Sequence, residues 1–256
     1  MPDLERALRA RRDRGGRAFV PYVTAGLKGV DAAFLRGLAE AGADAIEVGL
    51  PFSDPVMDGG AIQEASRLAL EAGTRTDDVL ALVEEAGTDV PVAVMTYFNP
   101  ILRHGIDAFL RDAARAGVAG VIVPDLPVDE AGDLALACRA TGVALVLLAA
   151  PGSPPGRLGA IAGLGGGFVY CVATYGVTGE RDRLEATARE LVRALRPLTE
   201  LPLRVGVGIG TPEQAAEACG FADGVIVGTA LVRRLLAGER DGALDLARAF
   251  RAAVSV

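Results

Sequence analysis

One acidic residue stands inside a segment that is otherwise apolar. Glu47 lies in Ala45-Ile-Glu-Val-Gly, which has the composition of a buried strand. Acidic side chains are almost never fully buried unless they are paired or functional. An arginine partner would give Glu47 a structural role. We favour a functional one, because burial raises a carboxyl pKa toward the range that acid–base catalysis near neutral pH requires.

Two more carboxylates follow in the turn-rich segment Pro51-Phe-Ser-Asp-Pro-Val-Met-Asp-Gly-Gly. Asp before Pro or Gly is ordinary turn chemistry, so Asp54 or Asp58 alone would be interpreted as structural. Together with Glu47 at the end of the preceding strand, they form a group of carboxylates. We therefore predict a candidate acid–base pair among Glu47, Asp54 and Asp58.

Glycines near the end of the chain indicate a phosphate site. They occur in Val205-Gly-Val-Gly-Ile-Gly-Thr and Val227-Gly-Thr-Ala, and their spacing misses the G-x-G-x-x-G pattern of dinucleotide sites. Backbone N–H groups and a helix N-terminus in such loops can hold a phosphate dianion, although the glycines could also serve only as tight turns. Val177-Thr-Gly-Glu-Arg could add a further glycine, and Tyr175–Arg183 could form a lid that excludes water.

The remaining residues of chemical interest are interpreted as structural. The only histidine, His104, precedes Gly105 at a loop-to-helix junction, where a surface or capping role fits best. No triad can be assembled around it, and no His/Cys/Asp cluster predicts a metal. Three widely spaced cysteines without a C-x-x-C pattern are typical of buried thiols in a reducing compartment. They are Cys138, Cys171 and Cys219.

Eight short apolar runs rich in β-branched residues recur along the chain. They are continuous rather than alternating, as in parallel strands that are covered on both faces. The predicted strands are Ala18–Thr24, Ala45–Gly49, Pro91–Thr96, Ala119–Pro124, Val143–Leu148, Gly167–Val172, Leu203–Val207 and Asp223–Val227.

Amphipathic stretches lie between these runs, and glycine follows several of them, as expected of a left-handed helix C-cap. Examples are Asp31–Ala41, Ile106–Ala116, Asp129–Thr141 and Leu184–Leu195. Eight strand–helix repeats without a linker predict one α/β domain over residues 1–256, a single (β/α)8 TIM barrel with an extra N-terminal helix at Leu4–Arg14. A doubly wound open sheet is the alternative, and we disfavour it because no glycine-rich turn follows the first strand.

Two of the connections are long. The loop after the second predicted strand is Pro51–Gly60, and the loop after the sixth is Ala173–Arg183. A helical pattern begins only after each of them. Typical loops of this kind have about two to six residues. Long loops after the strands of such barrels lie on the catalytic face, so we expect the chemistry there.

The amino-acid composition limits the kinds of binding partner that we expect. The 256 residues are 51% hydrophobic, and the net charge of −7 is spread along the chain. This balance disfavours nucleic acid and anionic membranes as partners, and each apolar run is too short to span a bilayer. The segment Met1–Arg17 is charged and lacks the apolar region of a secretory signal. We therefore expect a cytoplasmic protein.

Several motifs, in order along nearly the whole chain, resemble the tryptophan synthase α subunit family. Glu47-Val-Gly-Leu-Pro-Phe-Ser-Asp-Pro-Val-Met-Asp-Gly is close to that family's E-x-G-x-P-F-S-D-P-x-A-D-G-P. The other matching segments are Met95-Thr-Tyr-Phe-Asn-Pro-Ile, Pro124-Asp-Leu-Pro-Val-Asp-Glu, Gly176-Val-Thr-Gly, Gly208-Ile-Gly-Thr-Pro-Glu-Gln and Phe221-Ala-Asp-Gly-Val-Ile-Val-Gly-Thr-Ala.

The resemblance implies a carbon–carbon lyase that cleaves indole-3-glycerol phosphate to indole and glyceraldehyde 3-phosphate in tryptophan biosynthesis. It implies that Glu47 transfers protons, that Asp58 holds the indole N–H, and that Thr178 orients Asp58. The implied phosphate ligands are Gly179, Gly208, Gly228 and Thr229, and the implied lining of the indole pocket is Tyr22, Met95, Ile122, Leu148, Tyr170 and Val207. A β subunit in an α2β2-type assembly would be the partner, and pyridoxal phosphate would belong to that subunit, with no cofactor in this chain.

The chain departs from the family pattern mainly in its loops. The unusual residues are Leu27-Lys28, Met57, Gly60, Ala173-Thr-Tyr175 and Val207 in place of a common Phe. Three alternatives stay open: a stand-alone lyase without a β partner, a non-catalytic activator of a β subunit, and a barrel isomerase of a sugar phosphate. Retention of both Glu47 and Asp58 argues against the non-catalytic activator.

Overall fold

Eight parallel strands close into a barrel in a computed structural model that describes residues 3–173, 181–206 and 208–255. The strands follow one another around the barrel in chain order, and β8 pairs with β1. Their bounds are β1 Ala18–Thr24, β2 Ile46–Gly49, β3 Val92–Met95, β4 Val118–Ile122, β5 Ala144–Ala149, β6 Val169–Val172, β7 Leu203–Gly206 and β8 Gly224–Val227. The predicted barrel is confirmed, and the open-sheet alternative is wrong.

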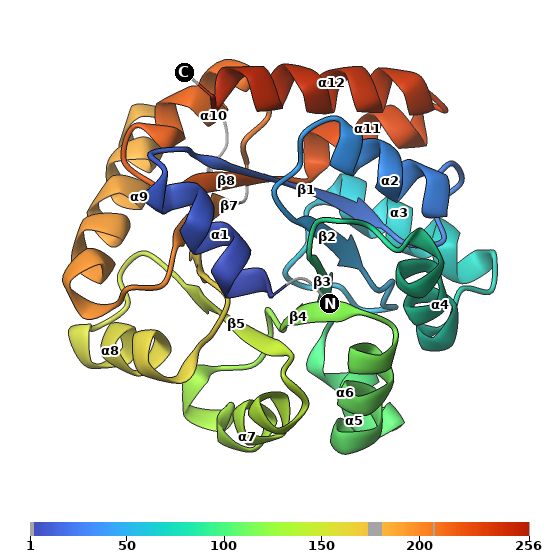
Figure 1. Ribbon diagram of the computed structural model, residues 1–256, viewed down its shortest axis with the longest axis horizontal. Coiled ribbons are helices and arrows are strands. Elements are labelled where there is room, and N and C mark those ends of the chain that lie inside the picture. Colours follow the sequence, from blue (N-terminus) through green and yellow to red (C-terminus); the bar gives the residue numbers. More distant parts are fainter. Residues whose placement is uncertain (1–2, 174–180, 207, 256) are drawn as a thin grey trace.

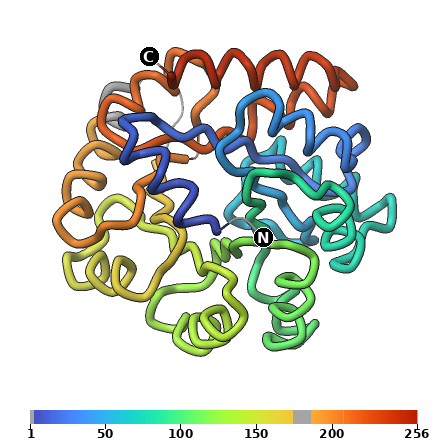
Figure 2. The backbone as a smooth tube through the Cα atoms, in the orientation of Figure 1, coloured from blue at the N-terminus to red at the C-terminus, as the bar shows by residue number. Residues whose placement is uncertain are grey.

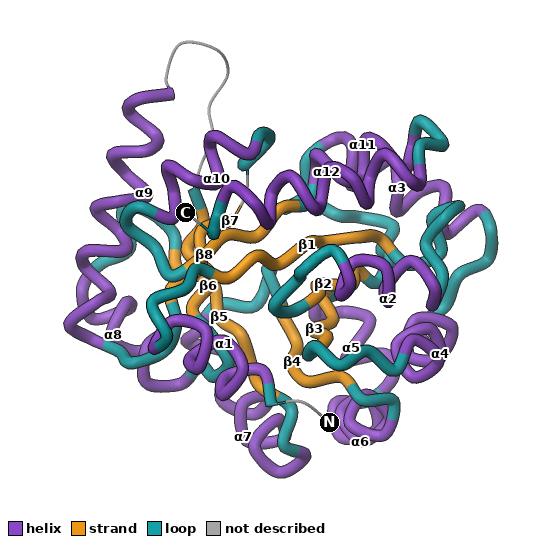
Figure 3. The backbone as a smooth tube through the Cα atoms, turned by 45° about the horizontal axis from the view of Figure 1, so that its top comes forward, coloured by secondary structure: helices purple, strands orange, loops and turns teal. Residues whose placement is uncertain are grey.

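Helices surround the strands on all sides, as Figures 1 and 3 show. The colours in Figure 2 run once around the ring, so each strand–helix unit lies beside its neighbours in sequence. The helices are α1 Leu4–Asp13, α2 Ala32–Glu40, α3 Gly60–Glu71, α4 Thr76–Ala86, α5 Phe98–His104, α6 Ile106–Arg115, α7 Gly132–Thr141, α8 Pro155–Leu164, α9 Arg181–Leu195, α10 Pro212–Cys219, α11 Thr229–Leu236 and α12 Arg240–Ala253, with short 3-10 turns at Val128–Glu130 and Arg196–Leu198.

The predicted element boundaries hold within a few residues, with two differences. The stretch predicted as one helix over Asp129–Thr141 is a 3-10 turn followed by α7. The loop predicted to extend through Arg183 is shorter, because α9 already begins at Arg181. Its first three residues include no Gly or Pro that would prevent helix formation. The rest of the predicted lid, residues 175–180, lies outside the described residues.

The inside of the barrel is filled by one apolar cluster and closed at one end by α1. The buried members of this cluster are Leu4, Leu8, Ala18, Val20, Ala45, Ala93, Ala119, Ile122, Val146, Phe168, Tyr170 and Ile226. Figure 1 shows α1 crossing the barrel opening that faces the viewer, at the end where the strands begin. The predicted N-terminal helix is therefore a plug in the bottom of the barrel.

Local chemistry explains why α1 forms and where it sits. The Asp3 carboxylate caps its N-terminus by accepting the Arg6 N–H at 2.9 Å. Leu4 and Leu8, four residues apart on one helix face, are 1% and 0% exposed. A side chain at Gly120 would collide with Leu4, so this glycine in β4 makes room for the plug.

A buried arginine of β7 forms a hydrogen bond with α1, the helix that plugs the barrel. Arg204 in β7 is fully buried and donates to the backbone carbonyls of Leu8 and Asp223. Its Nε has no hydrogen-bond partner within the described part of the chain. Burial lowers the pKa of its guanidinium to about 10, which leaves it charged at neutral pH.

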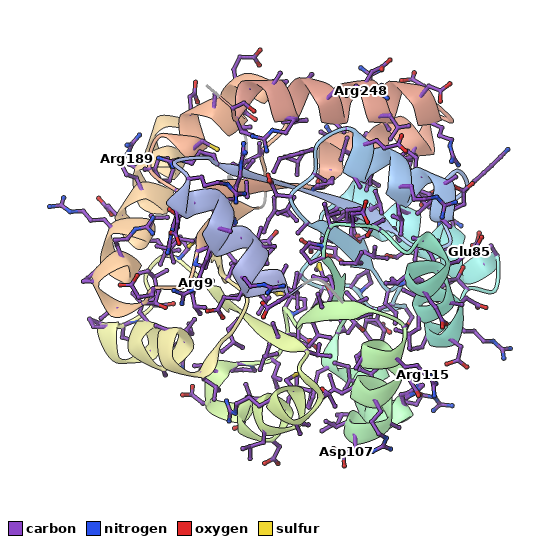
Figure 4. The ribbon with its side chains drawn as sticks, viewed as in Figure 1. Arg9, Glu85, Asp107, Arg115, Arg189 and Arg248 are labelled. Atoms are coloured by element: carbon purple, nitrogen blue, oxygen red, sulfur yellow. The ribbon has the colours of Figure 1, made fainter. Side chains whose placement is uncertain are left out.

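Most other charged side chains lie on the outside, and Glu47 and Asp223 are buried exceptions. Figure 4 labels several of them at the rim of the molecule, among them Asp107 and Arg115 of α6 and Arg248 of α12. Arg115 is 2.8 Å from Asp112, and Arg248 is 2.6 Å from Asp245, so opposite charges are interspersed. No helix among the described residues is long and apolar enough to cross a membrane.

The plug yields a stability prediction. We expect Leu8→Ala to lower the free energy of unfolding by about 2–5 kcal/mol, because it leaves a cavity in the barrel core. Leu136 in α7 is 61% exposed, so Leu136→Ala is a matched control that should change stability by less than about 0.5 kcal/mol. Urea unfolding followed by circular dichroism measures both, and equal effects would show that α1 is not part of the cooperative core.

Candidate active site

Strand β2 carries a buried acid into the barrel. Its Ile46 and Val48 pack in the outer core with the helices, so Glu47 between them points inward. Glu47 is 1% exposed, and its Oε2 has no hydrogen-bond partner in the described part of the chain. The register sets it beside Tyr22 of β1 and Ala93 of β3.

The surroundings of Glu47 keep it protonated. Burial, reinforced by the negative charge of Asp58, raises the pKa of its carboxyl to about 8. No arginine in the described part of the chain contributes to this shift, so no ion pair among those residues accounts for Glu47. At neutral pH this side chain is a neutral acid with a proton to donate.

The second carboxyl comes from the long loop between β2 and α3. Hydrogen bonds of this loop fix the backbone of Asp58, whose N–H donates to Pro55 at 3.0 Å and whose carbonyl accepts from Gln63 at 2.9 Å. Burial raises the pKa of the Asp58 carboxyl to about 6, and a hydrogen bond from Tyr97 holds it below what burial alone would give. Asp58 is therefore mostly ionised at neutral pH.

Tyr97 is a member of this site that the sequence did not single out. It lies two residues after the end of β3 and is 3% exposed, and its hydroxyl accepts the Met57 N–H at 2.9 Å. Its ring stacks on Phe52 with 5.0 Å between the centroids. Its position in the sequence could have identified it, because a residue just past the end of a barrel strand lies on the catalytic face.

The two acids thus share one site in different protonation states. The negative charge of Asp58 contributes to the raised pKa of Glu47. Neighbouring titratable groups whose pKa values are pushed apart are the usual mark of an acid and a base with separate tasks. This pair can donate a proton from Glu47 and offer a negative charge at Asp58.

Apolar and aromatic side chains surround the acids. Met95, Ile122, Leu148 and Tyr170 pack in the barrel-interior cluster, from the ends of β3, β4 and β5 and from β6. Tyr22 lies beside Glu47, and its hydroxyl is 3.3 Å from Thr24 Oγ1. Such a lining suits a flat aromatic ligand.

Two glycines make room for tyrosine hydroxyls: Gly49, which the sequence did not mark, and Gly206, which belongs to the glycine-rich segment predicted to bind phosphate. A Cβ at Gly49 would overlap the hydroxyl of Tyr22, and a Cβ at Gly206 would overlap that of Tyr170. Both tyrosines are buried, and burial raises the pKa of each hydroxyl. They remain neutral phenols beside the acids.

The predicted phosphate residues that are described lie after β7 and β8. Gly208 has a φ of +90°, a conformation that favours glycine, and Gly228 is the N-cap of α11, which begins at Thr229. The N-terminus of α10 is capped by Thr211 and Gln214, whereas α11 has no side-chain cap. The first N–H groups of α11 are therefore the better anion site. Thr178, Gly179 and Val207 lie outside the described residues.

The residues interpreted as structural do lie in structural positions. His104 ends α5, where its Nε2 is 2.9 Å from Asp112 and its ring meets Phe109 edge-on. The three cysteines are buried free thiols, as predicted. Among the described residues, no group of three or more His, Cys, Asp or Glu side chains could hold a metal ion.

A cavity of about 790 Å³ opens at the opposite end of the barrel, between α1, α7 and the starts of β5 and β6. Its wall mixes acidic and basic side chains, and Arg9 is already paired with Glu5 at 2.8 Å. Neither Glu47 nor Asp58 reaches it. The end of the barrel that carries both acids is therefore the candidate active site.

Comparisons with known proteins agree with this assignment. A family model described as tryptophan synthase alpha chain matches residues 8–253. The tryptophan synthase alpha chain of Streptomyces avermitilis is 45% identical over 96% of this chain and 91% of its own length, and that of Carboxydothermus hydrogenoformans is 46% identical over 87% and 85%. A crystal structure of tryptophan synthase from M. tuberculosis is similar with a TM-score of 0.90, 38% identity and full coverage of both chains. The crystal structure of the tryptophan synthase subunit alpha of Legionella pneumophila is similar with a TM-score of 0.89 and 32% identity, and the match covers 99% of this chain and 98% of that one.

The raised pKa of Glu47 predicts a dependence of stability on pH. The unfolded chain releases this proton near pH 4.5, whereas the folded chain keeps it until about pH 8. The stability from Glu47 is therefore complete below pH 4.5 and falls by up to about 1.4 kcal/mol per pH unit up to pH 8. Glu47→Gln removes this loss, so its free energy of unfolding should exceed that of the wild type increasingly from pH 5 to pH 8. A constant difference in urea unfolding across this range would contradict the shift.

Proposed function

The chain belongs to the tryptophan synthase alpha chain family, and we propose that it cleaves indole-3-glycerol phosphate to indole and glyceraldehyde 3-phosphate. The observation that carries this proposal is the pair of buried acids, Glu47 neutral and Asp58 ionised, in an apolar barrel mouth. A retro-aldol cleavage of this substrate needs a proton donor, a proton acceptor and a negative charge near the indole nitrogen.

Glu47 serves as both donor and acceptor. Its neutral carboxyl gives a proton to indole C3, and the resulting carboxylate takes the proton of the side-chain hydroxyl as the carbon–carbon bond breaks. The carbon that carried this hydroxyl becomes the aldehyde of glyceraldehyde 3-phosphate. Glu47 ends the cycle protonated, as its raised pKa favours.

Asp58 stabilises the intermediate. Protonation at C3 leaves a positive charge on the indole ring, concentrated at the nitrogen. An ionised Asp58 that accepts the indole N–H stabilises this charge more strongly in the transition state than in the bound substrate, which is what accelerates a reaction. Thr178 has the task of orienting Asp58.

The rest of the site binds the two ends of the substrate. The indole ring occupies the apolar lining of Tyr22, Met95, Ile122, Leu148, Tyr170 and Val207. The phosphate binds to the backbone of Gly179, Gly208 and Gly228 and to Thr229 at the start of α11. The uncapped N-terminus of α11 supports this placement of the dianion.

The proposed setting is that of an α subunit. The barrel, residues 1–256, works as one domain in the cytoplasm and joins a tryptophan synthase β subunit, which carries the pyridoxal phosphate. Val56 and Met57, in the loop after β2, are 78% and 55% exposed, and apolar side chains in such positions suit a partner surface. The apolar barrel mouth disfavours a sugar-phosphate isomerase.

One assay decides between the remaining alternatives. Purified protein is supplied with indole-3-glycerol phosphate, and indole release is followed with and without a β subunit. Release that the β subunit increases supports the proposal, and release that it leaves unchanged favours the stand-alone lyase. No release under either condition identifies a non-catalytic activator or another substrate.

The acid pair predicts the pH profile and the effect of two conservative substitutions. In the free enzyme, kcat/KM should rise with pH as Asp58 ionises near pH 6 and fall as Glu47 loses its proton near pH 8. Glu47→Gln and Asp58→Asn should each lower indole release at least about a hundredfold while the protein stays folded. A variant with wild-type turnover would remove that residue from the mechanism.

The proposed phosphate site at the N-terminus of α11 predicts that a negative charge there weakens substrate binding. Thr229→Asp should raise KM about tenfold or more, because its carboxylate repels the phosphate. It should leave the melting temperature unchanged or higher, since an acidic residue suits a helix N-terminus. Thr229→Asn is the neutral control of the same shape and should change KM much less. Equal KM values for the two variants would place the phosphate elsewhere.

A further inference from the structure

Another cavity, of about 460 Å³, lies on the outer wall of the barrel. It is formed by the end of α9, the 3-10 turn that follows this helix and the chain just before β8. Three arginines surround an apolar floor in its lining, which consists of Arg189, Arg193, Arg196, Val192, Pro197 and Phe221. No acidic side chain of the described residues lines it, whereas the cavity beside α1 mixes acids with arginines.

The three arginines lie on one side of α9 and its continuation. Arg189, Arg193 and Arg196 are four and three residues apart, which is the spacing of neighbours on a helix surface. Figure 4 labels Arg189 at the rim of the molecule. The whole chain has a net charge of −7, so this group of cations is a local reversal of sign. A positive surface in a hollow attracts anions.

Arg196 is held in place by an acid beneath it. Its two terminal nitrogens donate to the two carboxylate oxygens of Asp223 at 2.8 and 3.0 Å. Asp223 is itself fixed, because its Oδ2 accepts the Leu203 N–H at 2.8 Å and its own N–H donates to the Leu203 carbonyl at 2.9 Å. The Asp223 side chain is 8% exposed and that of Arg196 is 41% exposed, so the cation faces outward. Two of the five N–H donors of the guanidinium are used in this pair, so the others remain for a ligand.

The floor of the cavity is also formed in advance. The guanidinium carbon of Arg189 lies 4.5 Å from the centroid of the Phe221 ring, a cation–π contact. Val192 packs in the outer core and is 3% exposed, and the ring of Pro197 fixes its own backbone. A ligand that binds here therefore loses little free energy to the ordering of protein side chains.

Arg193 is the remaining cation of the cavity. It is exposed and forms no ion pair within the described part of the chain. It lies in the last turn of α9, where a cation also suits the negative end of the helix. That structural role explains one arginine, but it requires neither the apolar floor nor the oriented guanidinium of Arg196.

We propose that this cavity binds an aromatic phosphate monoester. The aromatic ring packs on the apolar floor, and the phosphate accepts charge-assisted hydrogen bonds from Arg193 and Arg196. A bare phosphate would leave the floor exposed, and a neutral ring would leave the arginines without an anion. Neither Glu47 nor Asp58 lines the cavity, so the inference does not depend on the proposed function.

A titration with three probes tests the proposal. Phenyl phosphate, inorganic phosphate and phenol are added in turn, and NMR follows the methyl groups of Val192. Phenyl phosphate should shift them in a saturable way with a dissociation constant of about 1 mM or lower. The other two probes should bind at least about tenfold more weakly, because each supplies only part of the contacts. The methyl group of Met95 reports binding in the barrel mouth, so the two sites are observed separately.

Two substitutions test the part of the arginines. Arg193→Gln should weaken the binding of phenyl phosphate at Val192 about tenfold, because it removes a charge-assisted hydrogen bond. Arg115→Gln is the matched control, since Arg115 is an exposed arginine of α6 that does not line the cavity. It should leave the affinity at Val192 unchanged.

Four results would overturn the proposal. The first two are the absence of a saturable shift at Val192 and an equal affinity for inorganic phosphate, which would show a site for anions of any kind. The third is an equal loss of affinity in Arg115→Gln, which would show that only the overall charge matters. The fourth is a lower melting temperature in Arg193→Gln with unchanged binding, which would assign Arg193 to the helix terminus alone.

Discussion

The site depends on the burial of one carboxyl that no counter-ion among the described residues neutralises. A closed barrel with helices outside and an apolar cluster inside surrounds Glu47 with no cation from the described residues and leaves it 1% exposed. Such an environment disfavours the charged form and so keeps a proton on the acid at neutral pH. The same barrel must be closed at its far end, which α1 achieves with Leu4 and Leu8.

The second acid, Asp58, must be ionised where Glu47 is neutral, and its position in the fold favours the ionised form. Asp58 lies on a loop at the edge of the barrel, where it is less buried than Glu47 and receives a hydrogen bond from Tyr97. Strand and loop thus create two different dielectric environments a short distance apart. The chemistry follows from this difference, since two acids in the same environment would titrate together.

Much of this arrangement was visible in the sequence, because continuous apolar runs mark strands covered on both faces. An acid inside such a run had to be buried, and Glu47 is. Tyr97 and Gly49 were not singled out, and Gly206 was noted only as part of a phosphate segment, because their contacts depend on which side chains meet them in the folded barrel. A sequence pattern gives the direction of a side chain but not the register that selects its neighbour. The start of α9 was misplaced because polar residues without Gly or Pro suit a helix as well as a loop.

Two buried side chains, Arg204 and Glu47, have different roles at the two ends of the barrel. Arg204 at the plugged end keeps its charge, since its lowered pKa of about 10 is still far above neutral, and backbone carbonyls of α1 and of the chain before β8 accept from it. Glu47 at the open end has a pKa moved across neutral and keeps an oxygen without a partner. Arg204 fixes structure through the two carbonyls that it binds, whereas the oxygen of Glu47 without a partner lies at the end of the barrel that a ligand can reach. The oxygen of Glu47 without a hydrogen-bond partner therefore lowers the stability of the fold, and it leaves an acceptor free to bind the substrate hydroxyl.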